Sequence, residues 1–498
     1  MLNTLLSIKI KNRIKQIEEL IKNTIERQNK ILKTNILVAK KTTFGKEHYF
    51  KDINSYTKFK KYIPIREYPE LRHYIELIKQ KQENILWPGK TKWFAQSSGT
   101  TENKSKFIPI TKESLDDCHF KAGKDMLSFY CNNYPKSKIF TGRSLMIGGS
   151  TSISQFEKYY YGDLSAIIIK NLPIWVQLKR SPSIKTALLK DWEQKIEQLI
   201  NETYTQNITS ISGVPSWTMI IINKVLKKMD VEYLHDIWPN LELYMHGGIS
   251  FDNYQKSFQK YIKNGKLNYL EIYNASEGFF GIQNEPNKSD LLLLIDHGIF
   301  YEFIPIANGE EKKDKIIPLQ EVELNKIYAM VITTNAGLWR YKIGDTIFFT
   351  SLEPYKIKIN GRIQSFVNSF GEELSEHHAN QAIKYACQKT QAIVNEYIVA
   401  PLFYPDKTGA HEWFIEFSKK PINLASFNDM LDSQLKILNS DYEAKRYKNI
   451  LLKPPIINVL KSNFFYDLLK NQNRIGGQNK IKRLHNNRKI IREIIKKS

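Results

Sequence analysis

The 498 residues exceed the roughly 250–300 at which a single hydrophobic core stops growing, so we expect two or more domains. Hydrophobic residues make up 42% and charged residues 25%, which is typical of a globular protein and excludes a disordered or fibrous chain. The formal net charge of +23 would suit a nucleic-acid or membrane partner. Because the basic residues are spread along the chain together with isoleucine and asparagine, we expect neither partner.

Cysteine usage and the absence of targeting segments indicate the compartment. Cys118, Cys131 and Cys387 form no CxxC pair, so neither a disulfide framework nor a zinc site is expected. The first residues lack the cleavage site of a signal peptide, and no apolar stretch reaches the roughly 20 residues that span a bilayer. We therefore expect a cytoplasmic protein in a reducing environment.

In chain order, the first elements are helical and the next alternate between strands and helices. Residues 1–35 carry Ile and Leu at spacings of three and four, which predicts an amphipathic helix. Between 90 and 350, short runs rich in β-branched and aromatic residues alternate with helical stretches such as "SWTMIIINKVLKKM" at 216–229. The expected strands include "LSAIIIK" at 164–170 and "LELYMHGG" at 241–248. This alternation predicts an α/β architecture with a buried sheet.

After Gly361 the pattern changes to a helix, two strands, a further helix and a basic tail. Such an order is typical of a smaller α+β domain. The sequence thus predicts a large N-terminal α/β domain over residues 1–362 and a C-terminal domain over 363–498.

Several expected strands end in polar, glycine-containing turns. The turns are "IGGST" at 147–151, "HGGIS" at 246–250, "YNASEG" at 273–278 and "TNAGLWR" at 334–340. In open α/β sheets ligands bind beyond the strand ends, so these turns are candidates for one shared site. Taken singly, each could equally be a connecting loop.

The segment "SSGTTENKSK" at 97–106 gathers hydroxyls around one glycine and then adds lysines. Short hydrogen-bond donors, a close-approaching backbone and positive charge suit a phosphate group. The segment is not a Walker A loop, because no second glycine precedes the lysine. A polar surface loop is the structural alternative. The residues expected to cradle the β- and γ-phosphates are Ser97, Ser98, Gly99, Thr100 and Thr101.

Four segments together resemble a known family. In order they are "SSGTTENKSK", "YNASEG", "LWRYKIGD" at 338–345 and "GRIQSFVNSFGEEL" at 361–374. Their order and residue types resemble the adenylate-forming superfamily, and more specifically the GH3 family of acyl-acid amido synthetases. The likeness runs the full length of the chain and includes "SGVPSW" at 212–217 and the late "GGQNK" at 476–480. It implies a large adenylate-forming domain with central sheets flanked by helices, and a smaller, mobile C-terminal domain.

The resemblance implies a nucleotide site with ATP and Mg²⁺ as cofactors. Tyr273 offers a ring for adenine, and Glu277 offers the carboxylate oxygen that Mg²⁺ prefers. Ala275 and Ser276 belong to the same nucleotide motif, and Asp345 would accept hydrogen bonds from the ribose hydroxyls. A core tyrosine, a surface glutamate and a turn aspartate are the structural alternatives.

Two further positive residues follow from the same resemblance. Arg362 stands at the expected hinge between the domains and could contact ribose or phosphate. Lys480, after two glycines that permit an adaptable loop, is expected to reach the α-phosphate, with Lys482 as the alternative. Lys480, Glu277 and Thr100 are the expected catalytic residues. Trp217 is a candidate for the acyl pocket.

The predicted function is an ATP-dependent ligase that joins a carboxylic acid to an amine, with an amino acid as the expected amine. Phosphoryl chemistry of this kind needs positioning and charge neutralisation rather than a protein nucleophile. No Ser/His/Asp or Cys/His spacing diagnostic of such a nucleophile occurs, so His246 and the cysteines are expected to be structural. The alternatives are an acyl-CoA ligase, a basic nucleic-acid-binding protein and a non-catalytic nucleotide sensor.

Overall fold

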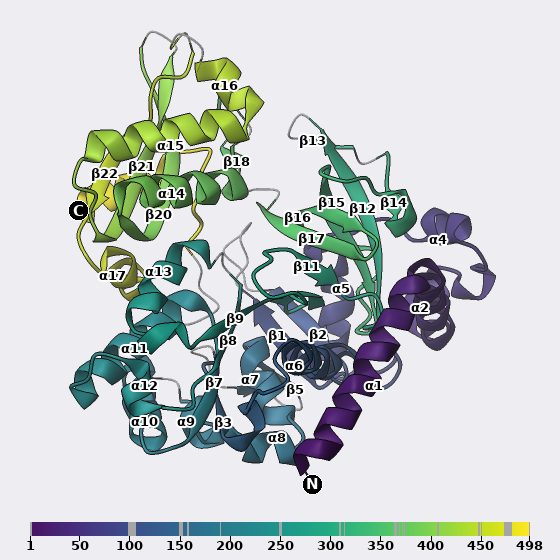
Figure 1. Cartoon of the computed structure of the whole chain (residues 1–498). Helices are drawn as coiled ribbons and strands as arrows, with labels where there is room; N and C mark the ends of the chain where they lie inside the picture. Colours follow the sequence, from purple (N-terminus) through teal and green to yellow (C-terminus); the bar gives the residue numbers. More distant parts are fainter. Residues whose placement is uncertain are drawn as a thin grey trace.

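The computed structural model has a mixed α/β fold with a large N-terminal part and a smaller C-terminal part, as expected (Figure 1). The structure describes residues 2–97, 106–148, 153–156, 159–189, 191–248, 251–307, 310–312, 314–362, 366–367, 369–370, 372, 374–405, 408–446, 449, 451–472 and 481–497.

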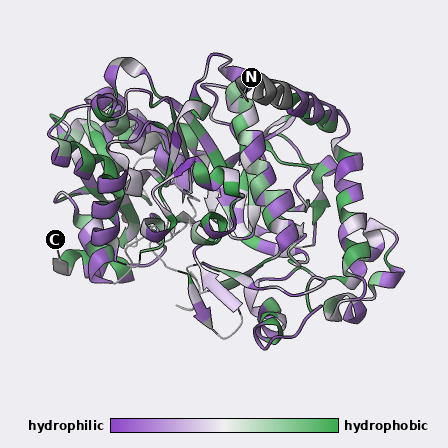
Figure 2. Ribbon diagram, turned by 90° about the horizontal axis from the view of Figure 1, so that it is seen from below, coloured by the Kyte–Doolittle hydropathy of each residue, from purple (hydrophilic) through white to green (hydrophobic). Residues whose placement is uncertain are grey.

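The N-terminal helices differ from the single helix expected over residues 1–35. The pattern divides at Asn23 into α1 and α2, and Ile31, Leu32 and Ile36 of α2 pack into the large core. Figure 2 shows helices that carry both hydrophilic and hydrophobic residues, which is the amphipathic pattern of helices with one buried face. These elements are α1 (Leu2–Lys22), α2 (Thr24–Ala39), α3 (Thr43–Glu47), α4 (Tyr56–Tyr62) and α5 (Tyr68–Lys79), with a 3₁₀ turn at Phe50–Asp52.

A large mixed sheet organises the N-terminal part. Strands β3, β6, β7, β8 and β9 are parallel, so the carboxyl ends of these strands meet at one edge of the sheet, and the remaining pairs are antiparallel. The order is β13 (Glu310–Glu311), β12 (Ile299–Ala307), β15 (Ile327–Thr334), β16 (Tyr341–Leu352), β17 (Tyr355–Arg362), β11 (Leu291–Leu293), β10 (Gly278–Ile282), β9 (Asn268–Ala275), β8 (Leu243–Gly247), β7 (Ile208–Ser212), β3 (Arg143–Met146) and β6 (Arg180–Ser181), with β14 (Ile317–Pro318) beside β12.

Helices pack on both faces of the parallel strands. Along β8, Leu243 and Met245 enter one core and Tyr244 enters another, because successive side chains point to opposite faces. The first face packs near α6 and α7, and the second packs on α10, α11 and α13. The helices are α6 (Lys121–Asn133, after a π-helix at Ser114–Phe120), α7 (Leu164–Asn171), α8 (Ile174–Leu178), α9 (Ile184–Ala187), α10 (Trp192–Thr203), α11 (Pro215–Met229), α12 (Leu234–Ile237) and α13 (Asp252–Lys260). Short 3₁₀ turns occupy Ile139–Thr141, Lys263–Gly265 and Leu319–Glu321.

The prediction that "LSAIIIK" is a strand is wrong, because this segment forms α7. A short run of β-branched residues has no periodicity that separates a buried strand from a buried helix. Here Leu164, Ala166, Ile167 and Ile169 are buried, so tertiary packing outweighs the β-propensity of the isoleucines. The other strand predicted by example, at 241–248, is confirmed as β8.

A second sheet carries the serine-rich segment. It has the order β2 (Lys106–Ile110), β1 (Trp93–Ser97), β5 (Tyr159–Gly162) and β4 (Ser154–Phe156). Because β1 and β2 pair antiparallel with Ser97 opposite Lys106, the segment 98–105 connects two adjacent strand ends.

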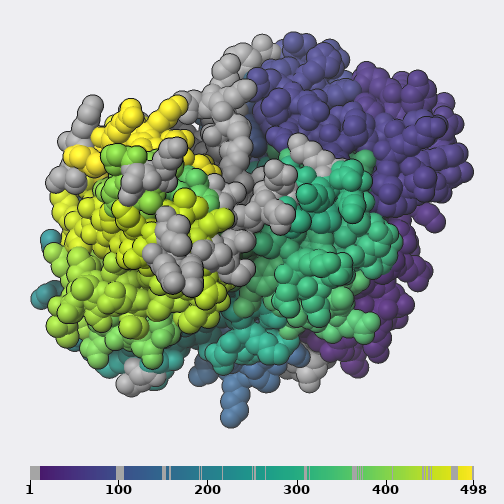
Figure 3. All heavy atoms as spheres, turned by 90° about the horizontal axis from the view of Figure 1, so that it is seen from above, coloured from purple at the N-terminus to yellow at the C-terminus, as the bar shows by residue number. Residues whose placement is uncertain are grey.

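The C-terminal part is an α+β unit with its own core. Helix α14 (Glu376–Thr390) and helix α15 (Leu424–Leu438) cover a sheet of β20 (Ile393–Phe403), β21 (Gly409–Lys419) and β22 (Ile456–Leu460). In Figure 3 this part, in green and yellow, lies beside the N-terminal part. The remaining elements are β18 (Phe366–Val367), β19 (Leu374–Ser375), α16 (Ser440–Arg446), α17 (Phe464–Asn471) and α18 (Lys489–Lys497).

Candidate active site

A cleft of about 1570 Å³ lies where the carboxyl ends of the parallel strands face the C-terminal part. Its lining includes Gly148, Gly213 and Gly248, which follow β3, β7 and β8, and it includes Glu376 and Lys482 from the C-terminal part. The described residues of the predicted polar turns therefore do meet at one cleft, with the exception of "TNAGLWR". Arg340 in that segment is buried and pairs with Glu302, with its Nε 2.9 Å from Oε2.

The hairpin of β9 and β10 brings the nucleotide motif to the cleft. Ala275 pairs with Gly278, so Ser276 and Glu277 form the two-residue turn at its tip. Ala275, Ser276 and Glu277 all line the cleft, and Ser276 is buried while Glu277 is partly exposed. A tight turn with an open tip is the local reason that a carboxylate is presented here.

Tyr273 and Asp345, predicted separately, are direct partners. The Tyr273 hydroxyl donates a hydrogen bond to Oδ2 of Asp345 at 2.7 Å, and both residues line the cleft. The tyrosine side chain is 5% exposed and its ring lies 4.9 Å from that of Phe280. The hydroxyl thus fixes the orientation of the carboxylate, a contact that sequence spacing could not indicate.

Arg362, in the predicted hinge region, lies directly opposite the predicted ribose ligand Asp345. Arg362 ends β17 and pairs in register with Asp345 of β16. The preceding Gly361 has φ +139°, and a Cβ there would lie 3.3 Å from the Cβ of Glu376, at the start of α14. The chain therefore passes from the large sheet to the C-terminal part at the edge of the cleft.

Part of the predicted phosphate loop lies outside the described residues. The backbone of Ser97 ends β1, and its register partner Lys106 lines the cleft. Ser98, Gly99, Thr100 and Thr101 fall in the segment that joins these two residues and stay a prediction. Both ends of that segment are positioned at the cleft by the paired strands.

The candidate mobile lysine, Lys480, also lies outside the described residues. Its alternative, Lys482, is exposed and lines the cleft. The choice between Lys480 and Lys482 stays a prediction. The described chain does place the end of this segment at the C-terminal wall of the cleft.

Arg483 is a cleft residue that the sequence reasoning missed. It lies in a run interpreted as a basic tail, yet its side chain is only 1% exposed. Its Nε lies 2.6 Å from Oε1 of Glu396, and Nη1 lies 3.1 Å from Oδ1 of Asn380 and 3.3 Å from Oε1 of Glu376. A buried guanidinium group needs acceptors such as these around it, so its side chain is held in one position. No sequence pattern predicts such an arrangement.

His246 and the cysteines are positioned as structural groups. His246 lines the cleft but is 3% exposed, stacks on Phe251 at 4.1 Å, and burial lowers its pKa to about 3. Burial raises the pKa of Cys118 to about 12 and that of Cys131 and Cys387 to about 11. The thiols are therefore protonated near neutral pH and are poor nucleophiles. Trp217 lines the cleft, and its place in an acyl pocket stays a prediction.

The metal prediction depends on one carboxylate. Among the described residues, no group of three or more His, Cys, Asp or Glu side chains could hold a metal ion. Mg²⁺ is usually bound by one or two carboxylates together with substrate phosphates, so a single glutamate at the cleft fits this ion better than it fits zinc. Glu277 at the hairpin tip is such a residue. In the same described part of the chain, no helix is long and apolar enough to cross a membrane.

Comparisons with known protein families match most of the chain. The GH3 family N-terminal domain matches residues 13–267, the GH3 family central domain matches 292–362, and the GH3 family C-terminal domain matches 377–489. The boundary between the central and C-terminal matches falls near the transition from Gly361 to α14.

Two similar proteins illustrate the likeness. The jasmonoyl-L-amino acid synthetase JAR6 of Nicotiana attenuata is 25% identical over 355 residues, which cover 58% of this chain and 60% of that relative. The solved structure of the AtGH3.15 acyl acid amido synthetase in complex with 2,4-DB has a TM-score of 0.80 at 16% identity, and covers 98% of this chain and 96% of that chain.

A solved structure of another ligase has the same fold. The 2-hydroxyisobutyryl-CoA ligase in its postadenylation state has a TM-score of 0.59 at 11% identity, and covers 96% of this chain and 92% of that chain. This chain thus shares its fold with that ligase.

Proposed function

Because this chain belongs to the GH3 family, we propose that it is an ATP- and Mg²⁺-dependent ligase that adenylates a carboxylic acid and transfers the acyl group to an amine, specifically an amino acid. The observation that carries the proposal is the convergence of Tyr273, Glu277 and Asp345 on one cleft at the carboxyl ends of parallel strands. The cytoplasmic location expected from the sequence stays a prediction.

In the first step a carboxylate oxygen of the acid attacks the α-phosphorus, and pyrophosphate leaves. Asp345, whose carboxylate is oriented by the Tyr273 hydroxyl at 2.7 Å, is proposed to accept hydrogen bonds from both ribose hydroxyls. Glu277 would hold Mg²⁺, which supplies neutralisation of phosphate charge. The hydroxyls of Ser97, Thr100 and the neighbouring loop residues would hold the departing phosphates.

In the second step an amine attacks the carbonyl carbon of the acyl-adenylate, and AMP leaves. The adenylate already carries a good leaving group, so no protein nucleophile is needed. We place the division between the two domains at 362/363 and propose that the C-terminal domain moves between the steps. Among the described residues, the hydrogen bonds that such a motion would break include Tyr254 to Glu396 at 3.2 Å and Tyr466 to Glu193 at 2.9 Å.

The second candidate function is an acyl-CoA ligase, in which a thiol replaces the amine. The fold likeness to 2-hydroxyisobutyryl-CoA ligase supports this reading less strongly, since its TM-score is 0.59 against 0.80 for the amido synthetase. Dependence on CoA rather than on an amino acid would identify it.

The test is AMP release by the purified protein with Mg-ATP, a pool of carboxylic acids and a pool of amino acids, with products read by mass spectrometry. A new amide mass together with AMP supports the proposal. Glu277→Gln should lower adenylate formation by about a hundredfold, as when a transition-state charge partner is removed. Glu323→Gln, at an exposed residue paired with Lys326, is the matched control and should keep full activity. Wild-type turnover in Glu277→Gln would remove this residue from the mechanism.

A further inference from the structure

We propose that the carboxylic acid used by this protein is an elongated, largely apolar one, such as an unbranched fatty acid, whose body lies in a channel running from the strand ends to α8. This inference rests on the proposed function for the position of the carboxylate. It goes beyond that function because it names the class of acid and the residues that determine the preferred chain length.

The channel has a floor made by one face of three parallel strands. Ser144 pairs with Ser210, and Ser212 pairs with both Met146 and Met245, so these five side chains lie on one face. All five line the cleft. The intervening Leu145, Ile211 and Tyr244 point to the opposite face and pack in another core. The strands thus present small or unbranched side chains to the cleft and fill the other face.

The roof of the channel is apolar and comes from the helices. The residues that line the cleft here are Leu127 of α6, Ile168 and Ile169 of α7, Leu172 at the end of α7, and Val176 of α8. Gly148 lies under this roof, because a Cβ there would be 3.3 Å from Cδ1 of Ile169. Sites for small molecules are mostly apolar with a few placed polar groups, and here the serine hydroxyls of the floor supply the polar groups.

The channel is long in one direction. Along β3 the residues at alternate positions from Gly142 to Gly148 all line the cleft. Six residue steps span at most roughly 20 Å at about 3.3 Å per residue, of which the four residues of β3 account for roughly 13 Å. The nucleotide candidates lie at the Gly148 end, because the carboxyl ends of the parallel strands meet there. A carboxylate at that end therefore leaves the whole length of β3 for the rest of the acid.

The far end of the channel opens beside an exposed apolar helix. Helix α8 has the sequence IWVQL, none of its residues is buried, and Ile174, Trp175 and Leu178 are 81%, 56% and 67% exposed. Trp175 lines the cleft whereas Leu178 does not. Although Lys179 and Arg180 also line this end of the cleft, the exposed apolar side chains of α8 fit a hydrocarbon chain that enters or protrudes here.

The experiment measures ATP–pyrophosphate exchange with a series of unbranched acids from butyrate through octanoate to palmitate. Each methylene that becomes buried should raise kcat/KM by about fourfold until the chain fills the channel. Equilibrium dialysis of the same acids without exchange measures their binding independently of chemistry. Both profiles should rise with chain length.

Two variants and one control locate the channel. Ser144→Phe fills the floor near its far end and should lower the palmitate-to-butyrate ratio of kcat/KM by about tenfold or more. Trp175→Ala acts at an exposed residue, so it should fold, and should lower the same ratio by a few-fold through lost contact. Leu178→Ala, on the same helix but outside the cleft, should leave the ratio unchanged.

The outcomes separate this inference from the proposed function. Exchange that is independent of chain length, with Ser144→Phe and Trp175→Ala ratios equal to wild type, overturns the elongated acid while the ligase stands. Chain-length-dependent binding without exchange overturns the ligase and supports the channel. If neither binding nor exchange occurs with any acid of the series, the elongated apolar acid is overturned, and turnover of other acids in the broad pool then decides the ligase separately.

Discussion

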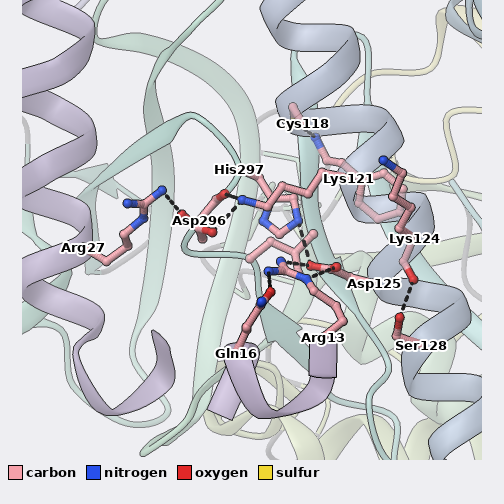
Figure 4. A network of polar contacts seen from close by, with 12 residues as sticks. Arg13, Gln16, Arg27, Cys118, Lys121, Lys124, Asp125, Ser128, Asp296 and His297 are labelled. Atoms are coloured by element: carbon pink, nitrogen blue, oxygen red, sulfur yellow. Dashed lines mark hydrogen bonds and ion pairs between the residues drawn. The ribbon is translucent and has the colours of Figure 1, made fainter. Parts of the chain in front are cut away.

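Two of the buried ion-pair networks in the described residues differ in what they border. One surrounds Asp125, where Arg13 of α1 binds both carboxylate oxygens at 2.6 and 2.7 Å and His297 lies 3.2 Å away (Figure 4). The same figure shows Asp296 between Arg27 and Lys121, so the network joins α1, α2, α6 and the loop before β12. The Asp125, Arg13 and His297 cluster does not line the cleft.

The other network surrounds Arg483 and forms part of the cleft wall. It joins the chain after residue 480 to α14 and β20, and Tyr254 of α13 reaches Glu396 from the N-terminal part. A buried ion pair is by itself weak evidence for stability, because desolvation of the charges offsets their attraction. The location of each network relative to the cleft therefore indicates its role. We expect the Asp125 network to contribute to folding alone. We expect the Arg483 network to contribute to folding and also to the positioning of Lys480 or Lys482.

The largest effect is expected from Arg483→Gln. The substitution leaves Glu396 buried without its cation, which should cost about 3–5 kcal/mol of unfolding free energy. It also frees the end of the segment that carries the candidate lysines, and a misplacement of about 1 Å can cost roughly a hundredfold in rate. We expect kcat for adenylate formation to fall by about that factor, measured by ATP–pyrophosphate exchange at a temperature where the variant is folded.

Two comparisons separate positioning from folding at this residue. Arg483→Lys should recover part of the stability but less of the rate, because a lysine cannot reproduce the forked contacts to Glu396 and Asn380. Arg488→Gln removes a nearby arginine that pairs with Glu412 at 2.7 Å outside the cleft, and should leave kcat unchanged. Wild-type kcat in folded Arg483→Gln would show that Arg483 is structural only.

Asp125→Asn should break the Asp125 network and lower stability without lowering kcat. Removing one partner of a buried pair leaves Arg13 without its carboxylate and should lower the unfolding free energy by about 3 kcal/mol. Because this cluster lies outside the cleft, kcat should stay at the wild-type value. Urea unfolding measures the first quantity and pyrophosphate exchange the second. Asp116→Asn, at an exposed pair with Lys112, is the control and should change neither.

The same network predicts a loss of stability on acidification. Burial acts to raise the pKa of Asp125, but the bonds from Arg13 and His297 outweigh it and lower the pKa. Burial also lowers the pKa of His297, with Asp125, Asp296 and Lys121 as its charged neighbours. Both groups are therefore less easily protonated when folded, so the unfolding free energy should fall as pH drops below about 6.5 through His297, and further below about 4 through Asp125.

Urea unfolding of wild type and Asp125→Asn across that pH range checks this prediction. The difference between the two proteins should shrink as pH falls, since protonated Asp125 no longer pairs with Arg13. A constant difference would mean that Asp125 does not titrate with folding.

Much of the fold followed from local patterns, whereas the two networks did not. Strand β9 with the turn at its end, strand β8 and helix α14 were predicted because each has a periodic run and a turn signal, whereas the pairing of β9 with β10 was not predicted. The helix α7 was not, because its isoleucines suit either state until packing decides. The pairing of Tyr273 with Asp345, 72 residues apart, needs strands β9 and β16 to be placed by the sheet. Arg483 was hidden among lysines for the same reason, since burial is a property of the assembled chain.

The smallest effect is expected where the two parts of the molecule meet. Tyr254→Phe removes a buried hydrogen bond of 3.2 Å to the carboxylate of Glu396 and should cost about 2 kcal/mol of unfolding free energy. Tyr466→Phe removes a bond of 2.9 Å to the exposed Glu193 and should cost less, since water replaces the lost donor. If the C-terminal domain moves between the two half-reactions, it has two orientations. Weakening a contact that exists only in the orientation described here shifts the equilibrium toward the second orientation. Tyr254→Phe should then change the ratio of amide formation to pyrophosphate exchange while Tyr466→Phe changes it less. Equal ratios in both variants and in wild type would mean that the Tyr254 contact persists through the reaction or that the motion is not limiting.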